Sequence, residues 1–188
     1  DYEIENMEDE ENEQPFDAEK IRVDQQMLSV KYMLELMDQD LIELNPGYQR
    51  RRVWRDNKKK SLLIESLMLR IPIPAFYFYE NEDGKYQVID GQQRLTTIRE
   101  FVNGEFRLTG LEYLGKDYNK RKFKDLDTKY VQRIYRTQIA VNILDARSPK
   151  NVIFDIFRRV NTGGVNLNPQ EMRNAICKQE VRDFLIKS

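Results

Sequence analysis

Apolar residues recur at helical spacing in the first half of the chain. After Ser29, four apolar positions fall on one face, and the pattern predicts a helix through Asp38 that the Ser29 side chain caps. Asp56 or Asn57 can cap a second helix, which prolines at 72 and 74 end because proline cannot continue a helix. The positions expected in the core of these and later helices are Leu62, Leu67, Ile98, Phe101, Ile153 and Phe157.

Short apolar or alternating runs predict four strands. The first covers residues 41–44 and stops at the turn Asn45-Pro46-Gly47. Residues 75–79 and 86–89 predict two strands, and the Asp83-Gly84 pair between them is typical of a hairpin. Residues 137–144 alternate apolar and polar positions and predict the fourth strand.

Further helices are expected between and after these strands. They cover about residues 95–102, part of the basic stretch 113–136, a segment opened by Ser148-Pro149, and a segment that begins at Asn168-Pro169. The resulting order is helix, strand, helix, hairpin, helix, strand, helix, helix. It predicts an α+β domain with a small mixed sheet surrounded by helices.

The composition limits the chemistry. The chain has no histidine, so it cannot contain a complete zinc hydrolase, HNH-type nuclease or Ser-His-Asp hydrolase. One cysteine excludes an internal disulfide and is compatible with a cytoplasmic location, and no apolar run is long enough to span a membrane. Catalysis would have to use carboxylates, amides, arginine, lysine or tyrosine, with a metal held by oxygen ligands.

Charge is unevenly distributed along the chain. Residues 1–20 contain ten acidic residues and one basic residue, so the 22 acidic and 30 basic residues that follow give a net charge of +8. We expect residues 1–22 to be an acidic, disordered tail and residues 23–188 to form the domain. A basic domain suits a polyanionic partner, although solvated surface lysines are an equally weighted interpretation. Because the chain starts at Asp1 and stops within a predicted helix, we expect it to be a segment of a longer protein.

The run Asp90-Gly91-Gln92-Gln93-Arg94 is the strongest candidate for chemistry. Gly91 permits either a close approach to a ligand or a strained turn, and the amides of Gln92 and Gln93 would lie at a helix N-terminus, which favours phosphate. Arg94 offers a fork of donors to phosphate oxygens, and Asp90 could bind Mg²⁺. The simpler alternative is a tight turn in which Asp90 only caps the helix.

Two other polar segments could bind an anion. The loop at 48–54 combines Tyr48, Gln49 and Arg50 with Arg51, Arg52 and Trp54, a mixture that suits a nucleotide or single-stranded nucleic acid. For Trp54 alone we favour a place in the core. The segment 158–164 ends a helix with Asn161-Thr162-Gly163-Gly164, which could form an anion nest or an ordinary helix stop.

Together these segments resemble a known family. The chain is similar to the N-terminal domain of GmrSD-type, modification-dependent restriction enzymes over roughly residues 28–178. The matching segments are Pro46-Gly47-Tyr48-Gln49-Arg50 through Trp54, Leu63-Ile64-Glu65-Ser66, Ile71-Pro72-Ile73-Pro74, Val88-Ile89 with the Asp90–Arg94 run and Leu95-Thr96-Thr97, and Phe157 through Gly164 with Leu167 and Glu171.

The resemblance implies a ParB/sulfiredoxin-like fold and a nucleoside triphosphate bound at the DGQQR run. Its hydrolysis would license a separate C-terminal HNH-type nuclease domain that this histidine-free chain lacks. The implied catalytic residues are Asp90, Gln92, Gln93 and Arg94, with Asp90 also at a Mg²⁺ site. The implied nucleotide-binding residues are Tyr48, Gln49, Arg50, Gly91, Arg94 and Asn161. We expect Arg51 and Arg52 to contact DNA, a role that the resemblance itself does not imply. Whether the domain forms a homodimer is left open.

Two other functions compete with an NTP-dependent regulator in phage defence. A non-enzymatic module could sense modified DNA through Arg50–Arg52 and the basic stretch 116–136. A ParB-like nuclease would need several carboxylates around Mg²⁺, and only Asp90 is a convincing one.

Overall fold

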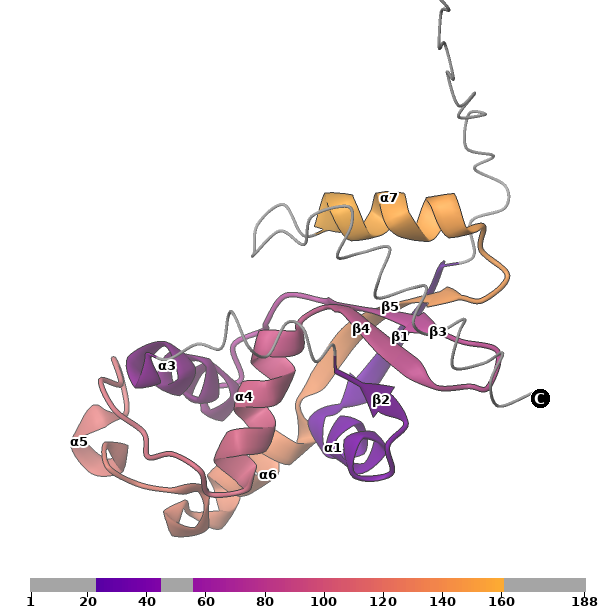
Figure 1. Cartoon of the computed structure of the whole chain (residues 1–188). Helices are drawn as coiled ribbons and strands as arrows, with labels where there is room; N and C mark the ends of the chain where they lie inside the picture. Colours follow the sequence, from indigo (N-terminus) through magenta and orange to yellow (C-terminus); the bar gives the residue numbers. More distant parts are fainter. Residues whose placement is uncertain (1–22, 45–55, 161–188) are drawn as a thin grey trace, which may run out of the picture.

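The computed structural model describes residues 23–44 and 56–160 (Figure 1). A mixed five-stranded sheet lies at the centre, in the order β1-β5-β3-β4-β2. β1 pairs with β5 and β3 with β4 in antiparallel fashion, whereas β3 pairs with β5 and β2 with β4 in parallel. The strands are β1 (Val23–Ser29), β2 (Ile42–Glu43), β3 (Phe76–Glu80), β4 (Tyr86–Asp90) and β5 (Gln138–Asp145).

Helices cover both faces of the sheet. α1, α3, α4 and α6 lie on one side and α7 on the other (Figure 1). The helical elements are α1 (Val30–Asp38), α3 (Asn57–Met68), α4 (Gln92–Val102), α5 (Gly115–Tyr118), the 3₁₀ turn η2 (Phe123–Asp125), α6 (Thr128–Arg136) and α7 (Lys150–Val160). The expected α+β class with a small mixed sheet is confirmed.

The core has two unequal parts. The larger part fills the space between the sheet and the four helices, and Phe76, Phe78 and Phe101 are fully buried in it. The smaller part lies on the α7 side, where Ile153 packs with Ile89 and Leu144. Burial of this apolar surface supplies the main driving force for folding.

Two helix caps and the hairpin read from the sequence are confirmed. The Ser29 hydroxyl accepts from the Tyr32 amide at 3.1 Å and starts α1. The Asp56 carboxylate accepts from the Lys58 amide at 2.9 Å and starts α3. β3 and β4 form the expected hairpin, in which the Asn81 side chain accepts from the Asp83 and Lys85 amides. These caps are local interactions, which explains why the sequence alone reveals them.

β1 is absent from the sequence prediction. Its residues are exposed at five of seven positions, so no apolar alternation marks them. The strand exists because it pairs with β5 over all seven residues, from Val23 opposite Leu144 to Ser29 opposite Gln138. Long-range pairing of this kind leaves no local trace in the sequence.

Two smaller expectations were wrong. α4 begins at Gln92, not near Leu95, because Gly91 turns the chain directly from β4 into the helix. Leu62 is only half-buried, since α3 turns Ile64, Leu67 and Met68 inward instead. As expected, the core includes Leu67, Ile98, Phe101 and Ile153, all of which are buried. The side chain of Phe157 is not among those that the structure describes.

Candidate functional site

The Asp90–Arg94 run forms the turn that joins β4 to α4. Gly91 has φ +105°, a left-handed conformation that L-residues with side chains rarely adopt. A Cβ built on Gly91 would lie 1.9 Å from Cδ1 of the fully buried Phe76 ring. Gly91 therefore makes the tight turn from β4 into α4, with the Phe76 ring packed against it.

Arg94 lies in the first turn of α4 and points back over the start of β3. Its guanidinium donates to the carbonyl oxygens of Pro74 and, at 3.3 Å, Ala75. The guanidinium carbon lies 4.4 Å from the centroid of the Phe76 ring, in a cation–π arrangement. Arg94 therefore ties the segment before β3 to the first turn of α4.

Asp90 shares this corner with Arg94. Its Oδ2 lies 3.6 Å from Nη2 of Arg94, and 35 % of its side chain is exposed against 14 % for Arg94. Burial raises the pKa of the Asp90 carboxyl, although Arg94 and the Gly91 amide act in the opposite direction. Burial likewise lowers the pKa of the Arg94 guanidinium against the effect of Asp90. The pair is thus a partly desolvated carboxylate and cation at the rim of the sheet.

A register shift in the hairpin lies beside Asp90. Asp90 is opposite Tyr77, but the next pair is Val88 with Phe78, so Ile89 is an extra residue on β4. Bulges of this kind re-aim side chains and are common near functional sites. Here the bulge lies directly before Asp90, the last residue of β4.

The two glutamines differ in exposure. Gln92 is buried at 6 % relative exposure, whereas Gln93 is half-buried, and both have interactions within the protein. Both residues belong to the first turn of α4, where backbone N–H groups and the helix dipole favour an anion.

A metal at this corner would have Asp90 as its protein ligand. No group of three or more acidic, cysteine or histidine residues is close enough to bind a metal in the described ranges. One carboxylate still fits Mg²⁺, because this ion commonly binds through one or two carboxylates together with phosphate oxygens and water.

Several expected site residues lie outside the described ranges. These are Tyr48, Gln49, Arg50, Arg51, Arg52, Trp54 and the segment from Asn161 to Gly164. Of the expected nucleotide site, the structure thus brings Asp90, Gly91, Gln92, Gln93 and Arg94 together.

Sequence reasoning gave no role to Glu65, which is 3 % exposed. Its Oε1 accepts from the Glu112 amide at 3.0 Å, and its Oε2 accepts from the amides of Tyr113 at 3.0 Å and Leu114 at 2.9 Å. One turn earlier, the buried Ser61 hydroxyl accepts from the Thr109 amide at 2.9 Å. A glutamate inside the apolar run of α3 was the available signal, since a buried charge needs dedicated partners.

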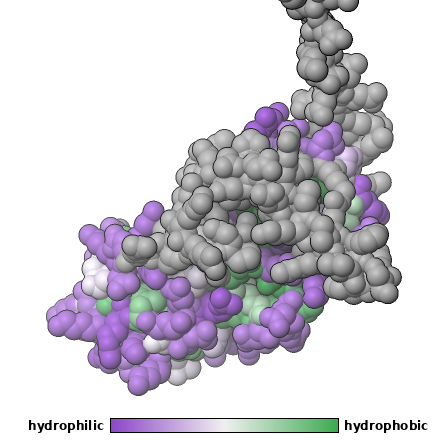
Figure 2. Space-filling view, in the orientation of Figure 1, coloured by the Kyte–Doolittle hydropathy of each residue, from purple (hydrophilic) through white to green (hydrophobic). Residues whose placement is uncertain are grey.

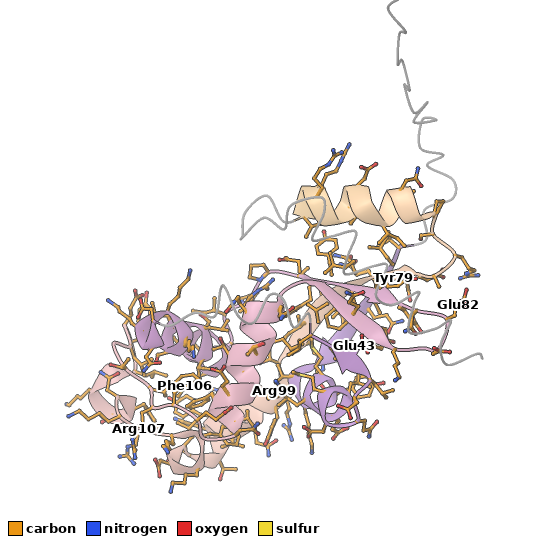
Figure 3. The ribbon with its side chains drawn as sticks, viewed as in Figure 1. Glu43, Tyr79, Glu82, Arg99, Phe106 and Arg107 are labelled. Atoms are coloured by element: carbon orange, nitrogen blue, oxygen red, sulfur yellow. The ribbon has the colours of Figure 1, made fainter. Side chains whose placement is uncertain are left out.

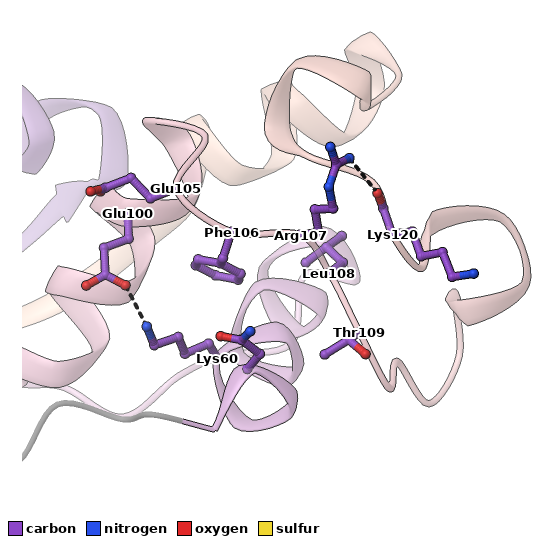
Figure 4. A pocket seen from close by; sticks show the side chains of 9 residues that line it. Lys60, Glu100, Glu105, Phe106, Arg107, Leu108, Thr109 and Lys120 are labelled. Atoms are coloured by element: carbon purple, nitrogen blue, oxygen red, sulfur yellow. Dashed lines mark hydrogen bonds and ion pairs between the residues drawn. The ribbon is translucent and has the colours of Figure 1, made fainter.

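A cavity of about 480 Å³ lies near the other end of α4 (Figure 4). Its lining includes Lys60, whose ammonium lies 2.8 Å from the Glu100 carboxylate. Phe106 and Arg107, which also line it, lie far from Tyr79 and Glu82 of the hairpin (Figure 3). Glu100 is eight residues from Gln92, roughly 12 Å along the helix, so this cavity and the DGQQR turn are separate.

Comparison with known proteins identifies a family. Residues 33–178 match the model described as the N-terminal domain of the GmrSD restriction endonuclease. No curated protein matches the chain. Among the described helices, none has the length and apolar content needed to cross a membrane.

One solved structure is similar over part of its length. It is the C-terminally truncated chromosome-partitioning protein ParB from Caulobacter crescentus, complexed with CTP-γ-S. The identity is 14 %, the TM-score is 0.37, and the match covers 77 % of this chain and 56 % of ParB. The chain thus spans little more than half of that structure.

Proposed function

The chain belongs to the family of GmrSD restriction endonuclease N-terminal domains, and from this we propose that its DGQQR turn binds a nucleoside triphosphate. The observation that carries the proposal is the corner formed by Gly91, which starts α4 directly beside the Asp90 carboxylate. A helix N-terminus next to a carboxylate that can share Mg²⁺ offers complementary groups to a metal-bound triphosphate.

Each residue of the turn has a distinct proposed role. The amides of Gln92 and Gln93 hold phosphate oxygens, and Asp90 holds Mg²⁺, whose charge would offset that of the phosphates. Gly91 fixes the turn, and Arg94 fixes the neighbouring segment while its charge favours the anion. Gln93 orients the attacking water better than Gln92, because Gln92 is nearly inaccessible.

Residues outside the described ranges complete the proposed site. Tyr48, Gln49, Arg50 and Asn161 contribute to nucleotide binding, and Arg51 and Arg52 contact DNA. Where the domain acts with an HNH-type nuclease domain, hydrolysis would license cleavage of modified DNA in the cytoplasm. The proposal also includes a homodimer of this domain.

The proposal is tested by calorimetry with Mg²⁺ and each of the four common NTPs. We expect one or more to bind, and Asp90→Ala to weaken binding about tenfold or more. Asp38→Ala, at the exposed end of α1, is the matched control and should bind like the wild type. If no NTP binds to the folded wild-type chain, the proposal is wrong.

A second candidate function is a DNA-binding module without enzymatic activity. Residues 107–136 contain nine basic and four acidic residues, a net charge of +5. Binding to DNA that is steeply salt-dependent but unaffected by NTP would favour this alternative.

A further inference from the structure

Tyr113 is the most exposed large hydrophobic side chain of the described residues. Its relative exposure is 74 %, against 58 % for the next, Met27. It lies in the loop between α4 and α5, far from the DGQQR turn in the sequence and on a different element. A single exposed aromatic ring is unremarkable, so its surroundings decide its meaning.

Side chains of α3 hold the backbone around Tyr113 in place. The buried Glu65 carboxylate accepts the amides of residues 112–114, and the buried Ser61 hydroxyl accepts the amide of Thr109. The Leu111 amide donates to Asn119 Oδ1 at 3.2 Å, which closes the loop onto the end of α5. Because this backbone is already ordered, little conformational entropy is lost when a ligand contacts the Tyr113 ring.

Exposed basic residues outnumber exposed acidic residues, here Glu112 and Asp117, in residues 107–121 and the first turn of α3. The side chain of Lys58 lies beside Gly110. A Cβ built on Gly110 would be 2.9 Å from Cγ of Lys58. Arg107 donates to the Lys120 carbonyl at 3.1 Å, and both residues line the 480 Å³ cavity together with Thr109. Figure 2 shows hydrophilic side chains gathered over the lobe that contains α3 and α5. The exposed basic residues of this surface are Lys58, Lys59, Arg107, Lys116, Lys120 and Arg121.

The placement of Lys58 and Lys59 is unfavourable for α3 itself. They lie in its first turn, where the positive end of the helix dipole disfavours cations, and the nearby carboxylate is that of Asp56 at the N-cap. Positions that break a local rule are often functional ones. Together with the neighbouring basic residues, Lys58 and Lys59 would attract a polyanion.

We propose that this surface, made by residues 107–121 and the first turn of α3, binds single-stranded or unpaired nucleic acid. Tyr113 stacks on an exposed base, and Lys116, Lys120 and Arg121 neutralise the flanking phosphates. Exposed aromatic rings among cations are the groups that such strands require, because bases in an intact duplex have no free face to stack on. The surface is separate from the DGQQR turn, so the proposal does not depend on nucleotide binding.

The test is fluorescence anisotropy of the full chain with a labelled oligothymidylate of about 12 nucleotides. We expect Tyr113→Ala to weaken binding about tenfold and Tyr113→Phe, which keeps the ring, to stay within about twofold. With an abasic strand of the same length the two variants should bind equally. Because Tyr113 is exposed, thermal unfolding of both should match the wild type.

Charge is tested separately. Lys116→Gln should weaken binding and lower the salt slope by about 0.7, whereas Lys85→Gln in the distant hairpin should change neither. Three results would overturn the proposal: no binding of the oligothymidylate, unchanged binding by Tyr113→Ala, or equally tight binding of an intact duplex with the same variant response. Loss of NTP binding in calorimetry would not affect it.

Discussion

The ring of Phe76 occupies the space that a side chain on Gly91 would need. Gly91 also has a left-handed backbone, so two independent constraints require glycine at this position. Phe76 in turn lies under the Arg94 guanidinium. Three positions of the turn and the adjacent strand thus form one packed unit.

Gly91→Ala should destabilise the protein by about 2–5 kcal/mol, because it adds backbone strain to a clash with a buried ring. Gly104 supplies the matched control: its φ is +77°, and a Cβ there would meet nothing within 4 Å. Gly104→Ala should therefore cost only about 1 kcal/mol. Urea denaturation of both variants measures the difference, and equal destabilisation would contradict the role given to Phe76.

Arg94→Lys should destabilise the protein by about 1–3 kcal/mol despite keeping the charge. An ammonium group cannot donate to the Pro74 and Ala75 carbonyls while stacking on Phe76 in the manner of a guanidinium. Arg99→Lys on the same helix should change stability by about 0.5 kcal/mol or less. If thermal unfolding of the two variants agrees, the contacts of Arg94 with these carbonyls are not stabilising.

Glu65→Ala should destabilise the protein by about 2–4 kcal/mol, because three backbone amides would lose a charged acceptor that is itself buried. Hydrogen exchange at residues 112–114 should become faster in the same variant. Glu112→Ala provides a control in the same loop, since its side chain is exposed. Unchanged exchange at these amides would show that Glu65 does not hold the loop.

The sequence was sufficient where structure depends on neighbouring residues. The Ser29 and Asp56 caps, the hairpin and the α+β class all follow from short patterns. The sequence was also sufficient to gather Asp90 through Arg94 in one turn, because the residues are contiguous.

It was insufficient where partners are distant in the chain. β1 depends on β5, the contacts of Arg94 depend on Pro74 and Ala75, and Glu65 binds amides 47–49 residues away. None of these pairings has a local pattern, although a glutamate within an apolar helix run indicates that a partner exists.

The most direct test of the nucleotide site is an NMR titration of the ¹⁵N-labelled chain with Mg²⁺ and the NTP that calorimetry selects. The proposal predicts saturable shifts that are largest at the backbone amides of Gly91, Gln92 and Gln93, with smaller changes at Thr109 through Lys120. Shifts centred on the 109–120 loop, with Gly91 through Gln93 unchanged, would contradict it.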